Sequence, residues 1–137
     1  MTFTENCTQK NIHREEIVRG GLYLVDLGDV EGRDNSLFGK IRPCCCVSNS
    51  KCNKFSPILT FICLSSISSS PEKLEKLRKM PTRVFVGKEE TGMKDSTAAC
   101  EQIISVPRSS IVRFIGKKLT DSTMDKINAA IRIQLEI

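Results

Sequence analysis

The sequence predicts a small, mainly β domain: a β-barrel of short strands that carries one C-terminal helix and short surface helices. Two observations carry this prediction. Short runs of apolar, β-branched and aromatic residues recur along the chain, and Gly, Pro, Asn, Asp and Ser separate them. After the last of these runs, the apolar residues change to helical spacing. The length of 137 residues suits one domain, and no internal repeat is visible.

Five segments have the composition expected of strands. We expect them over residues 22–27, 41–48, 58–64, 83–86 and 96–106. Pro43 has no backbone N–H, so it belongs at the start or on the edge of its strand. The segment 58–64 is apolar apart from Thr60, which predicts a central strand. The stretch 28–39 is rich in Gly, Asp, Asn and Ser and predicts a long mobile loop.

Two segments predict helices. A short surface helix is expected over 71–79, with Ser70 as its N-cap and Pro71 in the first helical position. A second, C-terminal helix begins after Thr120 or Asp121, either of which can cap it. Its apolar stripe consists of Met124, Ile127, Ala130, Ile131 and Leu135. Turns are expected over 49–55 and 87–94. The polar residues 1–16 form an N-terminal extension, which leaves 17–137 as the domain.

Charge and hydropathy narrow the class of protein. The net charge of +5 is compatible with a polyanionic partner such as RNA, although many ordinary proteins carry as much. The longest strongly apolar run, residues 58–64, is far shorter than the roughly 20 residues of a membrane-spanning helix. The N-terminus has no apolar stretch typical of a secretory signal. We therefore expect a cytoplasmic protein without a membrane segment.

The chain contains seven cysteines, three of them consecutive at positions 44–46. In a cytoplasmic protein they are expected to be thiols. Within a strand, Cys44 and Cys46 would face one way and Cys45 the other. We interpret them as small buried hydrophobic residues. A metal or redox role is the alternative, but no second cysteine pair has the spacing of a zinc site.

Six motifs occur in order between residues 17 and 135. They are I-V-R-G-G-L-Y-L-V-D-L-G at 17–28, G-K-I-R-P at 39–43, two apolar strands joined through Asn, Asn and Ser-Pro over 42–66, M-P-T-R-V at 80–84, D-S and C-E-Q-I within 95–103, and I-G-K-K-L at 115–119. Together they resemble the MazF/PemK toxins, whose patterns include R-G-D-I/V-Y-x-x-D-L, G-x-R-P, L-P-T-H/R-V, D-S-x-x-x-x-E-Q-I and I-G-x-L.

This resemblance implies an SH3-like β-barrel of the PemK/MazF/CcdB type and the toxin of a type II toxin–antitoxin system. Such a toxin would be a sequence-specific endoribonuclease that cleaves single-stranded RNA to 2′,3′-cyclic phosphate and 5′-hydroxyl ends. The resemblance also implies a homodimer, a cognate MazE/PemI-like antitoxin, and no metal or other cofactor.

By the same resemblance, the catalytic residues fall on Arg42 and Ser65, where most members have Thr at the second position. Arg42 can hold a phosphate with two parallel hydrogen bonds, and Ser65 can donate to a non-bridging oxygen. The one histidine, His13, lies in the expected extension, so a ribonuclease that uses two histidines is excluded. Without the resemblance, Ser65 would be interpreted as a hydroxyl at a strand end.

Several other residues are candidates for RNA binding. They are Arg19, Lys40 and Arg83 for phosphates, Gln102 for a base edge, and Phe38 for stacking on a base. Each cation has the simpler interpretation of a solvated charge. Tyr23 and Phe55 are further stacking candidates, and Phe55 fits the core equally well.

The sequence also departs from the family pattern. Gly21 replaces an Asp, the loop over 32–39 lacks the usual Glu-Gln, and the connection over 65–81 is longer and contains a basic helix. We expect the two longer connections to affect which RNA is cut or which antitoxin binds. Two alternative functions remain open: a DNA gyrase-poisoning toxin with the same barrel, and a non-catalytic barrel that binds RNA or protein.

Overall fold

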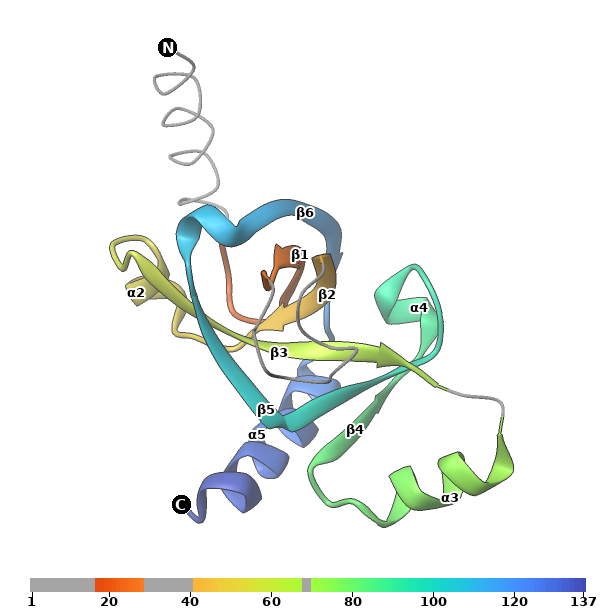
Figure 1. Ribbon diagram of the computed structural model, residues 1–137. Coiled ribbons are helices and arrows are strands. Elements are labelled where there is room, and N and C mark those ends of the chain that lie inside the picture. The colour runs from red at the N-terminus through yellow and green to blue at the C-terminus, as the bar shows by residue number, and fades with distance from the viewer. Residues whose placement is uncertain (1–16, 29–40, 68–69) are drawn as a thin grey trace.

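A computed structural model describes residues 17–28, 41–67 and 70–137 of the chain. Its strands form one antiparallel sheet with the order β4-β5-β3-β2-β1-β6 (Figure 1). The strands are β1 (Gly21–Asp26), β2 (Ile41–Cys46), β3 (Ile58–Ser66), β4 (Arg83–Val86), β5 (Ser96–Pro107) and β6 (Ile111–Lys118). The helices are α2 (Ser50–Asn53), α3 (Pro71–Lys79), α4 (Lys88–Thr91), the 3₁₀ turn η1 (Arg108–Ser110) and α5 (Asp121–Leu135).

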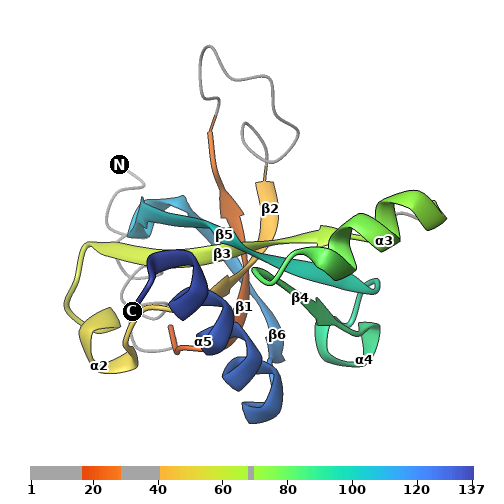
Figure 2. The same cartoon turned by 90° about the horizontal axis from the view of Figure 1, so that it is seen from below.

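The predicted mainly β class is confirmed, but the sheet is not closed into a barrel. In the described part of the chain, β4 and β6 lie at the two ends of the strand order and pair with one neighbour each. The long strands β3 and β5 cross the molecule, and α5 lies below them (Figures 1 and 2). The predicted extension 1–16 and most of the predicted loop, residues 29–39, lie outside the described residues.

Two separate hydrophobic clusters fill the two sides of the sheet. The first joins the sheet to α5 and contains Leu22, Cys45, Ile62, Leu64, Val84, Val86, Ala98, Cys100, Leu119, Met124, Ile127 and Ala130. The second contains Ile17, Tyr23, Val25, Cys44, Cys46, Leu59, Phe61, Cys63, Val106 and Ile111. Because side chains alternate along a strand, β1, β2, β3 and β5 each supply both clusters, whereas β4 supplies buried residues only to the first and β6 only to the second.

The cysteine run follows this alternation. Cys45 lies in the first cluster, while Cys44 and Cys46 lie in the second, as predicted. All three are fully buried, which confirms their interpretation as small core residues. Cys52, on α2, is exposed instead.

Helix α5 begins where the sequence indicates. The side chain of Thr120 accepts a hydrogen bond from the backbone N–H of Thr123, at 3.2 Å, and so caps the helix. Met124, Ile127 and Ala130 are buried against the sheet. Leu135, expected to extend this stripe, is 52% exposed because it lies in the last turn, beyond the core cluster.

Several predicted boundaries were wrong. Both predicted turns contain short helices. Asn49 starts α2 by accepting from two backbone N–H groups, and Gly92, with a φ of +72°, ends α4. Strand β3 runs two residues further than predicted, to Ser66. Strand β6 was not predicted. Ile111 is its one buried residue and most of the others are exposed, so its sequence lacks the apolar pattern of a strand with a buried face. In the described part of the chain, no helix is long and apolar enough to cross a membrane.

Candidate active site

The register between β2 and β3 brings the two predicted catalytic residues together. Cys44 pairs with Cys63, and Cys46 pairs with Phe61. Arg42 and Ser65 each lie two residues beyond the Cys44–Cys63 pair, where the two strands are no longer paired. Pairing between β2 and β3 begins only at Cys44, directly after Pro43, which lacks the N–H that would continue it. The predicted place of Pro43, at the start or edge of its strand, was wrong: it is the third residue of the inner strand β2 and pairs with Leu24 of β1, but it has no paired residue on β3.

Arg42 and Ser65 also lie on the same face of the sheet. Each is two residues from a thiol of the second cluster, Cys44 or Cys63, and residues two apart on a strand share a face. Both side chains are half-buried. The Nε atom of Arg42 is buried and has no hydrogen-bond partner among the described residues. A donor in this condition is available to a ligand oxygen.

The two thiols behind this pair contact each other. The Cys44 thiol donates to the Cys63 sulfur, at 3.6 Å. This hydrogen bond lowers the pKa of the Cys63 thiol and, together with burial, raises that of Cys44. The positive charge of Arg42 offsets part of the rise in the pKa of Cys44 and adds to the lowering of the pKa of Cys63, so its guanidinium lies near the thiols.

The polar residues continue across the next two strands. Ser65 pairs directly with Thr97 on β5, so their side chains share a face. The Thr97 hydroxyl accepts from Nη1 of Arg83 on β4, at 3.3 Å. Arg42, Ser65, Thr97 and Arg83 therefore form a line over β2, β3, β5 and β4, which we call the polar row. It places two hydroxyl groups between two guanidinium groups.

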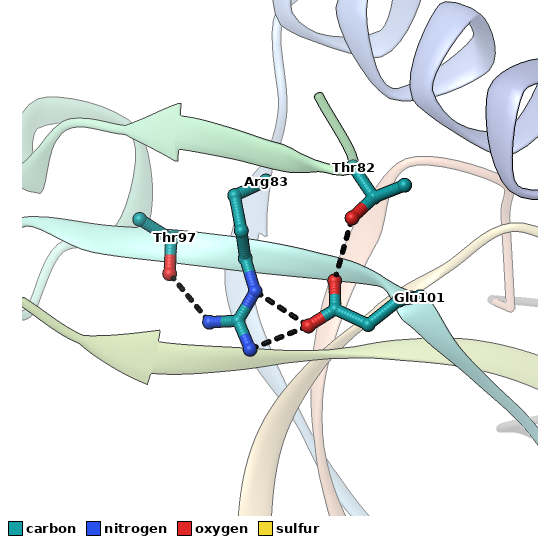
Figure 3. Close-up of polar contacts among 4 residues, drawn as sticks. All are labelled: Thr82, Arg83, Thr97 and Glu101. Atoms are coloured by element: carbon teal, nitrogen blue, oxygen red, sulfur yellow. Dashed lines mark hydrogen bonds and ion pairs between the residues drawn. The ribbon is translucent and has the colours of Figure 1, made fainter. Parts of the chain in front are cut away.

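A carboxylate holds Arg83 in place (Figure 3). Its Nε donates to Glu101 Oε2 at 2.7 Å, and its Nη2 lies 2.5 Å from the same oxygen. The other carboxylate oxygen accepts from the Thr82 hydroxyl at 3.1 Å. Because Glu101 balances the charge of Arg83, this arginine orients neighbouring groups more than it adds net positive charge to the row.

An open groove lies beside the row. Its lining residues are Arg42, Pro43, Leu64, Ser66, Met93, Lys94 and Ser96. Lys94 is exposed and brings a further cation to the Arg42 end of the row. No group of three His, Cys, Asp or Glu side chains in the described residues has the arrangement of a metal site.

The structure does not bring Arg19 to the polar row. Its Nε donates to the Val47 carbonyl at 3.0 Å, and its Nη2 donates to the side-chain oxygen of Asn128 on α5. The backbone N–H of the adjacent Gly20 donates to the carbonyl of Cys46. Cys46 is the last residue of β2, whereas Arg42 lies near the first. These contacts give Arg19 a structural role, which is to hold α5 against the sheet.

The structure places the other predicted RNA-binding residues in different environments. Gln102 lies in an irregular part of β5 next to Glu101, and its side-chain oxygen is buried without a partner in the described residues. Tyr23 is buried between Phe61 and Phe114 and cannot stack on a base. Phe55 is 82% exposed rather than part of the core, and it lies just before β3, at the end of that strand far from Ser65, so the structure does not bring it to the polar row. Phe38 and Lys40 lie outside the described residues.

Sequence reasoning missed Thr97, Glu101 and Thr82. Glu101 was part of a quoted motif, but its partner depends on how β4 pairs with β5. Thr97 becomes a candidate only once the register shows that it faces Ser65.

Comparison with known proteins decides the family. Residues 18–135 match the family model described as the PemK-like, MazF-like toxin of type II toxin–antitoxin systems. The chain belongs to this family. No curated protein matches the sequence of this toxin.

Solved structures share the fold of this toxin at low sequence identity. An endoribonuclease from a mycobacterial species has a TM-score of 0.65 and 20% identity, with 88% of this chain and 92% of that chain covered. The Mycobacterium tuberculosis toxin MazF-mt6 has a TM-score of 0.66 and 15% identity, with 85% and 97% covered. A MazE–MazF complex from Deinococcus radiodurans has a TM-score of 0.65 and 13% identity, with 88% and 97% covered.

Proposed function

We propose that this toxin is a sequence-specific endoribonuclease that cleaves single-stranded RNA at the polar row without a metal ion. The observation that carries this proposal is that Arg42 and Ser65 lie on one face of neighbouring strands, each two residues from one of the contacting thiols Cys44 and Cys63. The mycobacterial relative of the same fold is itself named an endoribonuclease. An RNA substrate would place the toxin in the cytoplasm.

The proposed reaction uses the RNA's own nucleophile. The 2′-oxygen attacks the neighbouring phosphorus, the bond from phosphorus to the 5′-oxygen breaks, and a 2′,3′-cyclic phosphate forms. The proton of the 2′-hydroxyl leaves to solvent, and the 5′-oxygen takes up a proton to become a hydroxyl. Arg42 holds the phosphate oxygens by charge and by its fork of N–H donors, and Ser65 donates to a non-bridging oxygen.

The proposal includes two protein partners. One is a second copy of the chain, in a homodimer. The other is a cognate antitoxin, as in the relatives whose structures contain one. An acidic antitoxin segment over the polar row would suit the cations Arg42 and Lys94, because opposite charges attract across an interface. Binding there would block RNA.

Purified toxin incubated with a long single-stranded RNA in EDTA is expected to make discrete cuts with 5′-hydroxyl ends. The described residues that carry the proposal are an arginine and hydroxyls, which need no metal to bind a phosphate. The ends are mapped by primer extension and by labelling with polynucleotide kinase. Intact RNA from folded, antitoxin-free protein would contradict the proposal and favour a gyrase poison, which a DNA supercoiling assay with gyrase would detect. Activity lost in EDTA and restored by Mg²⁺ or Zn²⁺ would contradict the metal-free mechanism.

Replacing Ser65 with alanine is expected to lower the cleavage rate about 10- to 100-fold, because one donor to the transition state is lost. Ser65→Thr keeps the hydroxyl and should retain most of the activity. The measurement is single-turnover cleavage of a short RNA that contains one mapped site. Since Ser65 is half-buried at a strand end, both variants should unfold at the wild-type temperature. Equal rates for Ser65→Ala and wild type would remove Ser65 from the mechanism.

A further inference from the structure

A second pocket opens at the Arg83 end of the polar row. It lies between α3 and the ends of strands β3, β4 and β5, where α3 stands beside the sheet (Figures 1 and 2). Its lining residues are Ile67, Leu74, Leu77, Arg78, Arg83, Phe85 and Thr97. Four of these are apolar and two are arginines. We call it the α3 pocket.

The α3 pocket is continuous with the polar row. Thr97 and Arg83 belong to both. Thr97 pairs with Ser65 on one side and with Phe85 on the other. Adjacent strands lie about 4.8 Å apart, so the backbone at Phe85 is roughly 10 Å from that at Ser65. A nucleotide next to the cleaved phosphate can span this distance.

The apolar residues of the pocket are not part of either core cluster. Phe85 is 59% exposed, although it lies on a strand of the sheet. Helix α3 buries none of its residues, and Leu74 and Leu77 are only half-buried. An exposed aromatic ring beside half-buried leucines indicates a surface that binds a flat apolar group.

The charges at the pocket narrow the type of ligand. The last turn of α3 contains Lys76, Arg78 and Lys79, and Lys73 lies one turn earlier. Glu72 and Glu75 offset part of this charge but leave α3 positive. Arg83 is held in position by Glu101, which prevents it from swinging away from the pocket. A flat apolar group attached to negative charge fits this combination, and a nucleotide of single-stranded RNA has both.

We infer that the α3 pocket binds one unstacked base of the RNA substrate, beside the bond to be cleaved. Phe85 stacks on the base, Leu74 and Leu77 close the pocket, and Arg78 at its rim contacts the adjoining phosphate. This inference rests on the proposed function, and it assigns to the α3 pocket the selection of one base near the cut.

The test compares Phe85→Ala with Phe55→Ala, a matched control in which another exposed phenylalanine is removed, between α2 and β3 and away from the polar row. Affinity is measured for a short RNA whose nucleotide at the cut carries 2′-deoxyribose and cannot be cleaved. We expect about 10-fold weaker binding for Phe85→Ala, because one stacked base is lost. Binding should be unchanged for Phe55→Ala and restored by Phe85→Tyr. Mapped cuts should show a relaxed preference at one position next to the cut.

The outcomes separate this inference from the proposed function. If wild-type toxin cleaves RNA, but Phe85→Ala keeps both its affinity and its preference, the inference fails and the proposed function stands. If Phe85→Ala weakens binding of the antitoxin alone, the pocket binds the antitoxin instead, and the inference is overturned. If wild-type toxin does not cleave RNA, the proposed function fails. The affinity series then decides whether the pocket binds a base.

Discussion

Replacing Arg42 with alanine is expected to reduce RNA cleavage by about 100- to 1000-fold while leaving the fold intact. The loss removes both the positive charge and the paired N–H donors that face the phosphate. Arg42 is half-buried at the start of β2, and its Nε has no partner in the described part of the chain, so few protein contacts are lost. Arg42→Lys retains the charge but not the fork of donors, and should recover only part of the rate. The measurement is single-turnover cleavage of an RNA with one mapped site.

The control for this experiment is Arg113→Ala. Arg113 is an exposed arginine on β6, and its side chain makes a long hydrogen bond, at 3.5 Å, to the adjacent carbonyl of Phe114. Its removal changes the net charge as much as Arg42→Ala does, but should leave cleavage unchanged. Full activity in folded Arg42→Ala protein would refute the assignment of Arg42. An equal loss in both variants would indicate that general charge, rather than the position of Arg42, determines the rate.

Replacing Arg108 with alanine is expected to lower the free energy of unfolding by about 2–4 kcal/mol. Arg108 is 6% exposed, in the turn η1 between β5 and β6. Its Nη2 donates to the carbonyls of Asn53, at the end of α2, and of Ser56, the latter at 2.6 Å. Carbonyls at the end of a helix have no hydrogen-bond donor within the helix. Arg108 provides a donor to the Asn53 carbonyl from a distant part of the chain.

Urea denaturation followed by circular dichroism measures this change, and Arg113→Ala again serves as the control, with an expected change within about 0.5 kcal/mol. Arg108→Met fills most of the space but cannot donate hydrogen bonds. It should therefore remain destabilised, although less than Arg108→Ala. Wild-type stability in both Arg108 variants would show that these hydrogen bonds contribute little.

The sequence predicted those features that depend on local patterns. The alternation of Cys44, Cys45 and Cys46 between two cores follows from strand periodicity alone. The N-cap at Thr120 and the buried stripe of α5 follow from side-chain chemistry and helical spacing. Strand β6 was missed because its sequence does not alternate between apolar and polar residues. Such alternation arises when one face of a strand is buried, and most residues of β6 are exposed.

The candidate site could be predicted only in part. The choice of Arg42 and Ser65 came from the family resemblance, whereas their position on one face of neighbouring strands depends on the pairing of β2 with β3. Arg19 shows the opposite case. Its charge suggested a phosphate contact, but its partners are Val47 and Asn128, and these lie far from it in sequence. Long-range pairings of this kind are set by tertiary packing, which a single sequence does not display.

The alternation along β2 limits how this family can change in length. Removing one residue between Arg42 and Cys46 would turn Arg42 to the opposite face and would exchange the side chains that enter the two cores. Removing or adding two residues would preserve the faces. Insertions before residue 41 carry no such penalty, because they do not alter the spacing from the arginine to the core cysteines. We therefore expect homologues to vary freely in length ahead of this strand, and to keep an odd number of residues between the arginine and any core position on its face.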